Sequence, residues 1–156
     1  EGNAGTGLGE NMMSGTIHVK GNSSQSAGAT AHGGTIIIDG DSSSRCGISM
    51  KGVDIIVKGS VGHMSAFMAQ AGTLLICGDA GDALGDSIYE TVIYLAGKPK
   101  SLGVDCIEKK VTKNDLKKIE NLIKIGNIKK LKPHNFKKFG SARKLYNFNI
   151  DNVSNY

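Results

Sequence analysis

Residues 5–9 read Gly-Thr-Gly-Leu-Gly, a run that could be taken for the glycine-rich loop of a dinucleotide-binding site. Such a loop holds a pyrophosphate only when a strand precedes it and a helix follows, because the helix N-terminus supplies N–H donors. Here residues 10–15 lead into another strand-like segment instead of a helix. These glycines therefore fit the bends of a repeating structure better than a nucleotide site.

The cysteines and histidines, which could ligate metals or act as nucleophiles, are scattered. Cys46, Cys77 and Cys106 are widely spaced and match neither a CxxC motif nor a Cys/His metal pattern. Cys46 falls in an apolar column with Leu8 and Leu84, which predicts an inert, buried thiol. Buried free thiols are typical of a reducing cytoplasm, where we expect the protein to be. We interpret all four histidines as structural or surface residues: His18, His32, His63 and His134.

An internal repeat of 19 residues underlies these positions. One column of the repeat holds glycines, each ending an apolar segment: Gly2, Gly21, Gly40, Gly59, Gly78 and Gly97. Branched apolar residues recur two and four positions before the glycine, such as Ile36 and Ile38, and a mixed column lies between them. This spacing of two predicts a β-strand with one buried face.

A second column of small residues has the same period. It consists of Gly9, Gly28, Gly47, Ala66 and Gly85. Because Ala66 replaces a glycine, we expect this column to need small volume at a crowded bend and not a positive φ angle. A 19-residue unit is too short for a helix pair or a propeller blade but sufficient for one solenoid coil. The sequence therefore predicts an all-β fold, a single-stranded parallel β-helix, in which each strand pairs with its copy one coil away.

The N-terminal register carries a further expectation. Gly2 already ends a strand, so the chain enters its first coil midway. We expect the natural chain or a partner to supply strands upstream, because an open first coil would leave backbone groups unpaired.

The repeat fades after Gly97, where the composition also changes. Residues 1–97 carry four Lys/Arg and nine Asp/Glu, a net charge of −5, whereas residues 98–156 carry 15 and five, a net charge of +10. Residues 113–125 place apolar side chains on one helical face, and Gly126 is expected to end this helix. We divide the chain into a parallel β-helix, a flanking amphipathic helix and an extended basic docking tail, at 1–111, 112–126 and 127–156.

Together with the glycine columns, two later segments resemble one known family. The segment 78–106 contains GDALGDSIYETVIYLAGKPKSLGVDC, and residues 136–149 read FKKFGSARKLYNFN. Nearly the whole chain resembles the C-terminal GXGXG domain of the glutamate synthase large subunit, a right-handed parallel β-helix. Some organisms, archaea among them, encode the domains as separate chains, and this short chain is similar to such a stand-alone subunit. A subunit of N-methylglutamate synthase is related, and the glycine-rich subunit of formylmethanofuran dehydrogenase more distantly so.

The resemblance implies a structural role. In glutamate synthase a glutaminase domain releases ammonia, and an FMN- and iron–sulfur-bearing domain condenses it with 2-oxoglutarate, while the GXGXG domain joins them without a catalytic residue. We therefore expect a non-catalytic subunit without a cofactor of its own. Its partners would be a glutaminase-type amidotransferase and an FMN/Fe–S synthase subunit, and self-association stays open. The residues expected at the partner contact are Lys137, Lys138, Arg143, Tyr146 and Phe148.

Two function classes compete with this interpretation. Catalytic β-helices that act on carbohydrates cluster carboxylates on one strand face, whereas Asp41 and Asp79 share the post-glycine column with Asn3 and Asn22. We interpret that column as polar caps of turns. The basic C-terminal part could bind nucleic acid, or it could fold against an acidic surface of its own body or of a partner. The chain has no run of 18 apolar residues, so no membrane-spanning segment is expected.

Overall fold

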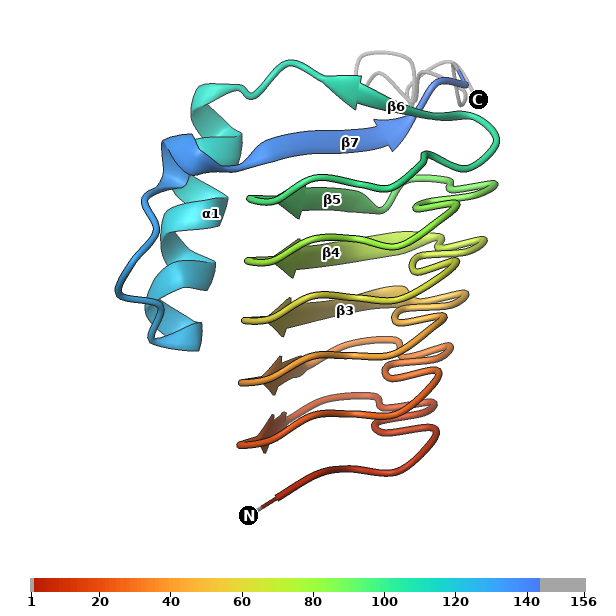
Figure 1. Ribbon diagram of the computed structural model, residues 1–156, viewed down its shortest axis with the longest axis vertical. Helices are drawn as coiled ribbons and strands as arrows, with labels where there is room; N and C mark the ends of the chain where they lie inside the picture. The colour runs from red at the N-terminus through yellow and green to blue at the C-terminus, as the bar shows by residue number, and fades with distance from the viewer. Residues whose placement is uncertain (1, 144–156) are drawn as a thin grey trace, which may run out of the picture.

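Short strands lie one above another in the register of the 19-residue repeat (Figure 1). The computed structural model describes residues 2–143. In this range seven strands form one sheet in the order β1-β2-β3-β4-β5-β7-β6. The elements are β1 (Thr16–Val19), β2 (Thr35–Ile38), β3 (Lys51–Val57), β4 (Ala71–Ile76), β5 (Val92–Leu95), β6 (Cys106–Lys109), α1 (Lys113–Gly126), a 3-10 turn (Pro133–Asn135) and β7 (Lys137–Ser141).

Strands β1 to β5 pair in parallel, each residue with its counterpart one coil away. Ile36, for example, pairs with Ile17 on one side and with Ile55 on the other. A second side of each coil makes parallel bridges of a single residue, such as Ser23 to Ser42. The predicted parallel β-solenoid with coils of about 19 residues, followed by a short helix, is confirmed.

The glycine column that ends the strands is required by close approach between coils. A Cβ built on Gly59 would lie 2.7 Å from the carbonyl oxygen of Gly40 and would also collide with the Asp41 carboxylate. That carboxylate has a structural task, because Asp41 Oδ1 accepts a hydrogen bond of 2.8 Å from the backbone N–H of Ser60. The same bond recurs in each coil, so the interpretation of this column as polar caps is confirmed. The acceptors are Asn3, Asn22, Asp41, Ser60 and Asp79.

The second small-residue column differs from the expectation. All its members have a positive φ, including Ala66 at 59°. The prediction that a positive φ is not needed there is wrong, because one L-residue tolerated in the left-handed region does not show that the region is avoided. The predicted crowding at this bend is present: a Cβ on Gly28 would lie 2.5 Å from Cδ1 of Ile55. Glycine in this column therefore satisfies both the backbone conformation and the space.

The coil around Ala66 stores more backbone strain than its neighbours. Met64, Ala66 and Met68 all have a positive φ, and none of them is glycine. We expect Met68→Gly to raise the free energy of unfolding by about 1 kcal/mol, because the left-handed conformation costs about 1–2 kcal/mol in an L-residue. Met68 is 40% exposed, so less packing is lost than at a fully buried methionine. Urea denaturation measures the change. As a control, Met13→Gly, at an exposed residue without a positive φ, should not stabilise the protein.

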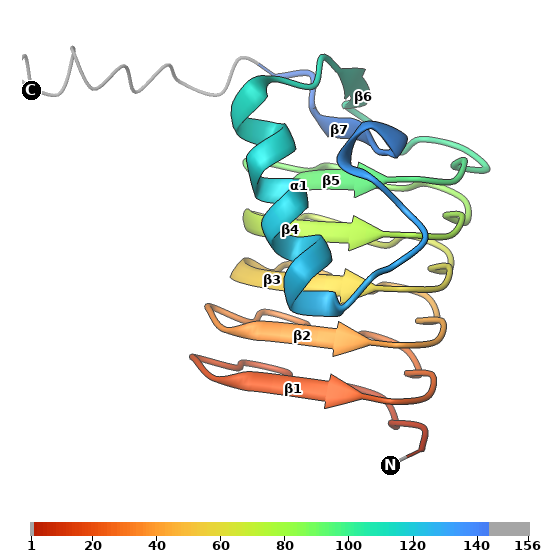
Figure 2. The ribbon, with the colours of Figure 1, turned by 90° about the vertical axis from the view of Figure 1, so that its left-hand side faces the viewer.

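The sheet is apolar on both faces. Alternate residues such as Ile36 and Ile38 fill the interior of the solenoid. The column between them, which is mixed in residue type, packs outward against Ile119 and Leu122 of α1 and includes Ile37, Ile56, Leu75 and Tyr94. Figure 2 shows α1 lying across the outer face of β3, β4 and β5. The flanking helix is therefore part of a second core.

Helix α1 confirms the predicted segment, with one difference at its end. Thr112 is the N-cap: its Oγ1 accepts a hydrogen bond from the N–H of Asp115, and the Asp115 carboxylate accepts one from the N–H of Thr112. Gly126 is the last helical residue, and Asn127 takes the left-handed cap conformation expected of Gly126. No helix in residues 2–143 is long and apolar enough to cross a membrane.

The described residues after the helix include a strand and not only an extended segment. Strand β7 (Lys137–Ser141) pairs antiparallel with both β5 and β6. Phe139 enters the solenoid interior, and Phe136 packs beneath α1. Residues 137–141 thus close the sheet beyond β5, which differs from the extended tail that we expected. Residues 136–139 read Phe-Lys-Lys-Phe, which lacks the alternation of a half-buried strand, so the sequence did not indicate β7.

Candidate partner-binding site

The described residues among those expected at the partner contact lie on β7 or directly after it, at the closed end of the solenoid. Lys137 and Lys138 belong to β7, and Arg143 follows that strand. Tyr146 and Phe148 lie outside the described residues. The closed end therefore brings together the described members of the predicted set.

The side chain of Lys138 is mostly buried and forms an ion pair within the molecule. Its Nζ lies 3.0 Å from Oδ2 of Asp115, and its side chain is only 18% exposed. Asp115 also accepts a hydrogen bond of 2.6 Å from the hydroxyl of Tyr94. Because these residues come from β7, α1 and β5, the cluster joins the helix to the sheet and to the closing strand.

The contacts of this cluster favour an ionised Asp115 beside a protonated Tyr94. Burial alone would raise the pKa of Asp115, but hydrogen bonds from Tyr94, Thr112 and Lys138 outweigh it and hold that pKa well below its usual value. Burial and the adjacent carboxylate raise the pKa of Tyr94, so its hydroxyl stays a donor. The cluster is therefore an ion pair with a structural role.

Lys137 and Arg143 have more exposed side chains. Nζ of Lys137 lies 3.7 Å from Oε1 of Glu108, with both side chains more than half exposed. The guanidinium of Arg143 lies 2.8 Å from Oδ2 of Asp105 and stands over the ring of Tyr89, 5.8 Å from its centroid. Both side chains can meet a partner without being pulled from a buried position.

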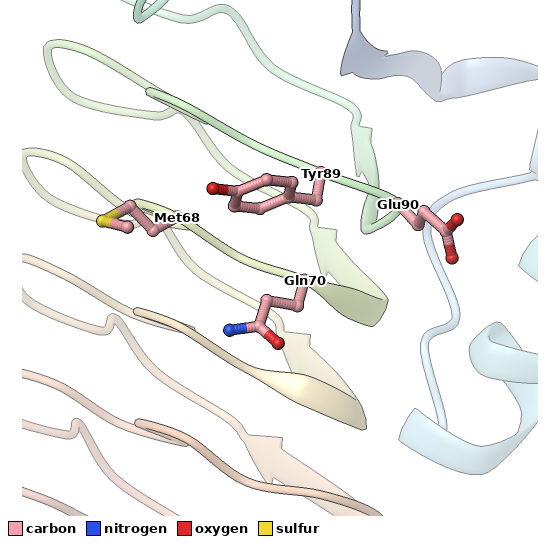
Figure 3. Close-up of a pocket in the computed structure, with 4 residues that line it drawn as sticks. All are labelled: Met68, Gln70, Tyr89 and Glu90. Carbon is pink, nitrogen blue, oxygen red and sulfur yellow. The ribbon is translucent and has the colours of Figure 1, made fainter. Parts of the chain in front are cut away.

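A shallow groove of about 380 Å³ adjoins Arg143. It is lined by Met68, Gln70, Tyr89 and Glu90. Figure 3 shows the side chains of Met68, Gln70 and Tyr89 pointing to one side of the coils, whereas Glu90 points away. An exposed methionine, an aromatic ring and an arginine are the residues that protein interfaces favour. Sequence reasoning missed this groove, because the column that contains Gln70 and Tyr89 has no consistent chemistry.

Most of the cysteines and histidines that could act as nucleophiles or metal ligands have structural or surface positions. Cys46 and Cys106 are buried, and burial raises the pKa of each thiol to about 11, so the prediction of a buried Cys46 is confirmed. His18 contacts a carboxylate that its spacing did not predict, with Nε2 2.9 Å from Oδ1 of Asp39. Its exposed position agrees with the interpretation as a surface residue. Within residues 2–143, no group of three His, Cys, Asp or Glu side chains is placed to hold a metal ion.

Comparison with known proteins places the chain in a family. No family model matches it, and no solved structure matches it. It is similar to Protein GlxC of Rhizobium meliloti (strain 1021), with 57% identity over 155 residues, which cover 99% of this chain and 68% of that protein. Identity at this level over almost the entire chain indicates common descent and a shared fold. The chain therefore belongs to the family of Protein GlxC.

Proposed function

We propose that this chain is a non-catalytic structural subunit of a multi-chain, cytoplasmic glutamate synthase. It would hold a glutaminase-type amidotransferase subunit beside an FMN- and iron–sulfur-bearing synthase subunit, so that ammonia passes to 2-oxoglutarate without loss. The resemblance of the chain to the GXGXG domain supports this proposal. We assign FMN and the iron–sulfur cluster to the partner subunit.

One structural observation carries the proposal. Two segments resemble the GXGXG domain most specifically, 78–106 and 136–149, and although they are distant in sequence, residues 137–141 of the second pair with strands of the sheet beside the first. Strand β7 lies between β5 and β6 and pairs antiparallel with both. Arg143 then follows β7 and stands over Tyr89 of the first segment. Described residues of both segments thus lie side by side at the closed end, as expected of a docking site shared by related complexes.

The rest of the solenoid supports a positional role. Solenoids provide a long rigid surface, because each coil contacts only its neighbours. The carboxylates that might suggest a carbohydrate-cleaving β-helix are occupied: Asp41 and Asp79 accept backbone hydrogen bonds from the next coil. A catalytic pair would need carboxylates free to meet substrate. These contacts favour a scaffold over that class of enzyme.

Affinity purification of the tagged chain from its native host tests the proposal. We expect two further proteins in a fixed ratio, with flavin and iron–sulfur absorbance and with glutaminase activity, whereas the isolated chain should show neither the absorbance nor the activity. Glutamate formation from glutamine and 2-oxoglutarate then identifies the reaction. Flavin or glutaminase activity in the isolated chain would refute the scaffold role. A complex that instead uses methylamine or formylmethanofuran would assign the chain to one of the related enzymes.

A further inference from the structure

A second groove lies at the C-terminal end of α1, away from β7. Its volume is about 380 Å³. One wall is formed by Lys58 and Cys77, which directly follow β3 and β4. The other wall is the connection after the helix, residues 127–131. The groove therefore runs between the solenoid and the segment that follows α1.

The start of the second wall, at Asn127 and Ile128, is fixed by backbone hydrogen bonds to α1. The N–H of Asn127 donates to the carbonyl of Lys124, and the N–H of Ile128 donates to that of Ile123, at 3.1 and 3.0 Å. Gly126 lies against the sheet, since a Cβ there would be 3.0 Å from a methyl carbon of Ile56. A ligand would thus meet a preformed groove, which lowers the ordering cost of binding.

The chemistry of the groove combines an apolar floor with a cationic rim. Cys77, Ile128 and Leu131 pack beside the second core but stay only partly buried. On the rim, Lys129 and Lys130 are exposed, and neither forms an ion pair among the described residues.

The carboxylate that pairs with Lys58, that of Asp39, is already engaged. Nζ of Lys58 lies 2.9 Å from Oδ1 of Asp39, and His18 shares that carboxylate. These contacts hold the pKa of Asp39 below its usual value despite its partial burial. Lys129 and Lys130 therefore leave the rim with excess positive charge.

We propose that this groove binds an acidic segment of a partner protein. One apolar side chain of the segment would enter between Cys77, Ile128 and Leu131, while its carboxylates would meet Lys129 and Lys130. Such an arrangement has the apolar centre and charged rim typical of peptide recognition. The inference concerns a site distant from β7 and does not depend on which complex the chain joins.

Nucleic acid fits the groove less well. Single strands bind through aromatic side chains that stack on bases, and the described residues that line this groove include no aromatic one. The apolar floor contributes to binding only if the ligand brings an apolar side chain.

Cys77 provides a direct reporter of occupancy. It lines the groove and is partly exposed, whereas Cys46 and Cys106 are 0% and 5% exposed. Burial raises the pKa of Cys77 to about 11, so alkylation by iodoacetamide should be slow but measurable at a pH of about 8.5. The full chain is titrated with a fluorescent peptide of glutamates around two leucines, with the same peptide carrying serines for leucines, and with an oligonucleotide of equal charge.

We expect the leucine-containing acidic peptide to bind most tightly and to slow alkylation of Cys77 several-fold. Lys129→Glu combined with Lys130→Glu should weaken that binding about 10-fold or more. The control combines Lys113→Glu with Lys117→Glu, which makes the same charge change about 15 Å or more along α1 and should weaken binding less than about twofold. Circular dichroism checks that both variants fold.

Four outcomes would overturn the proposal. Equal loss in both double variants would indicate general attraction to the basic surface. Equal binding of the serine peptide would show that no apolar side chain of the ligand contributes to binding. Protection of Cys77 by the oligonucleotide alone would favour nucleic acid. Protection of Cys77 at high protein concentration without any peptide, lost in Lys129→Glu/Lys130→Glu, would assign the groove to a second copy of this chain.

Discussion

Gly59→Ala should lower the free energy of unfolding by about 3 kcal/mol or more, because the added methyl group would collide with the backbone of the neighbouring coil. The new Cβ would lie 2.7 Å from the carbonyl oxygen of Gly40 and 2.9 Å from its carbonyl carbon. Backbone atoms cannot move aside to relieve such a contact, as the end of a flexible side chain can. The N–H of Gly59 donates to that same carbonyl, at 2.9 Å, so moving the coils apart breaks the ladder.

Urea denaturation followed by circular dichroism measures this change. Gly5→Ala is the matched control, because a Cβ there meets nothing within 4 Å and Gly5 has no positive φ. The control should stay within about 0.5 kcal/mol of the wild type. If the two variants had equal stability, the packing distance between coils that underlies the 19-residue register would be wrong.

Asp115→Ala should lower the free energy of unfolding by about 3–4 kcal/mol, because it leaves the poorly exposed Lys138 ammonium without its partner. It also removes the acceptor for the Tyr94 hydroxyl and half of the capping box at Thr112. Lys138→Ala should destabilise the protein in the same direction, whereas Lys137→Ala, at a neighbouring exposed lysine, should change stability by less than about 0.5 kcal/mol. Equal effects at the two lysines would contradict the internal role of Lys138.

Asp115 also makes stability depend on pH. Its pKa is held below the unfolded value near 4, so the ionised carboxylate stabilises the folded state. This contribution is fully present above the unfolded pKa and is lost as the pH falls through the folded pKa. Unfolding free energies of wild type and Asp115→Asn, measured by urea denaturation between pH 7 and pH 3, should therefore converge as the pH falls. A constant difference between the two proteins would show that ionisation of Asp115 is irrelevant to folding.

The repeat predicts the solenoid well because its constraints are local and recur in every coil. The glycine at position 59 and its equivalents must allow close backbone approach, and each strand before them must bury alternate residues. Such requirements appear directly as columns of residue type. The φ angle at Ala66 could not be inferred in this way, because glycine and alanine both satisfy a requirement for small volume.

Features that depend on contacts between distant segments are less visible in the sequence. Ile37, Ile56 and Leu75 face outward, and their apolar character makes sense only when α1 covers them. The residues of β7 resemble a tail because their partners, β5 and β6, are dozens of residues away in sequence. The ion pair of Lys138 with Asp115 follows from that same pairing. Sequence periodicity cannot indicate a strand such as β7 that occurs once and is not part of the repeat.

The proposal that this chain positions two partners is tested most directly by nitrogen transfer. The proposed glutaminase and synthase subunits are mixed with and without the chain, and amide-¹⁵N glutamine is supplied with 2-oxoglutarate and a reductant. With the chain present, we expect most ¹⁵N released from glutamine to appear in newly formed glutamate. Without the chain it should escape as free ammonia, while glutaminase activity and ammonia-dependent synthesis persist. Equal transfer of ¹⁵N with and without the chain would contradict the positional role.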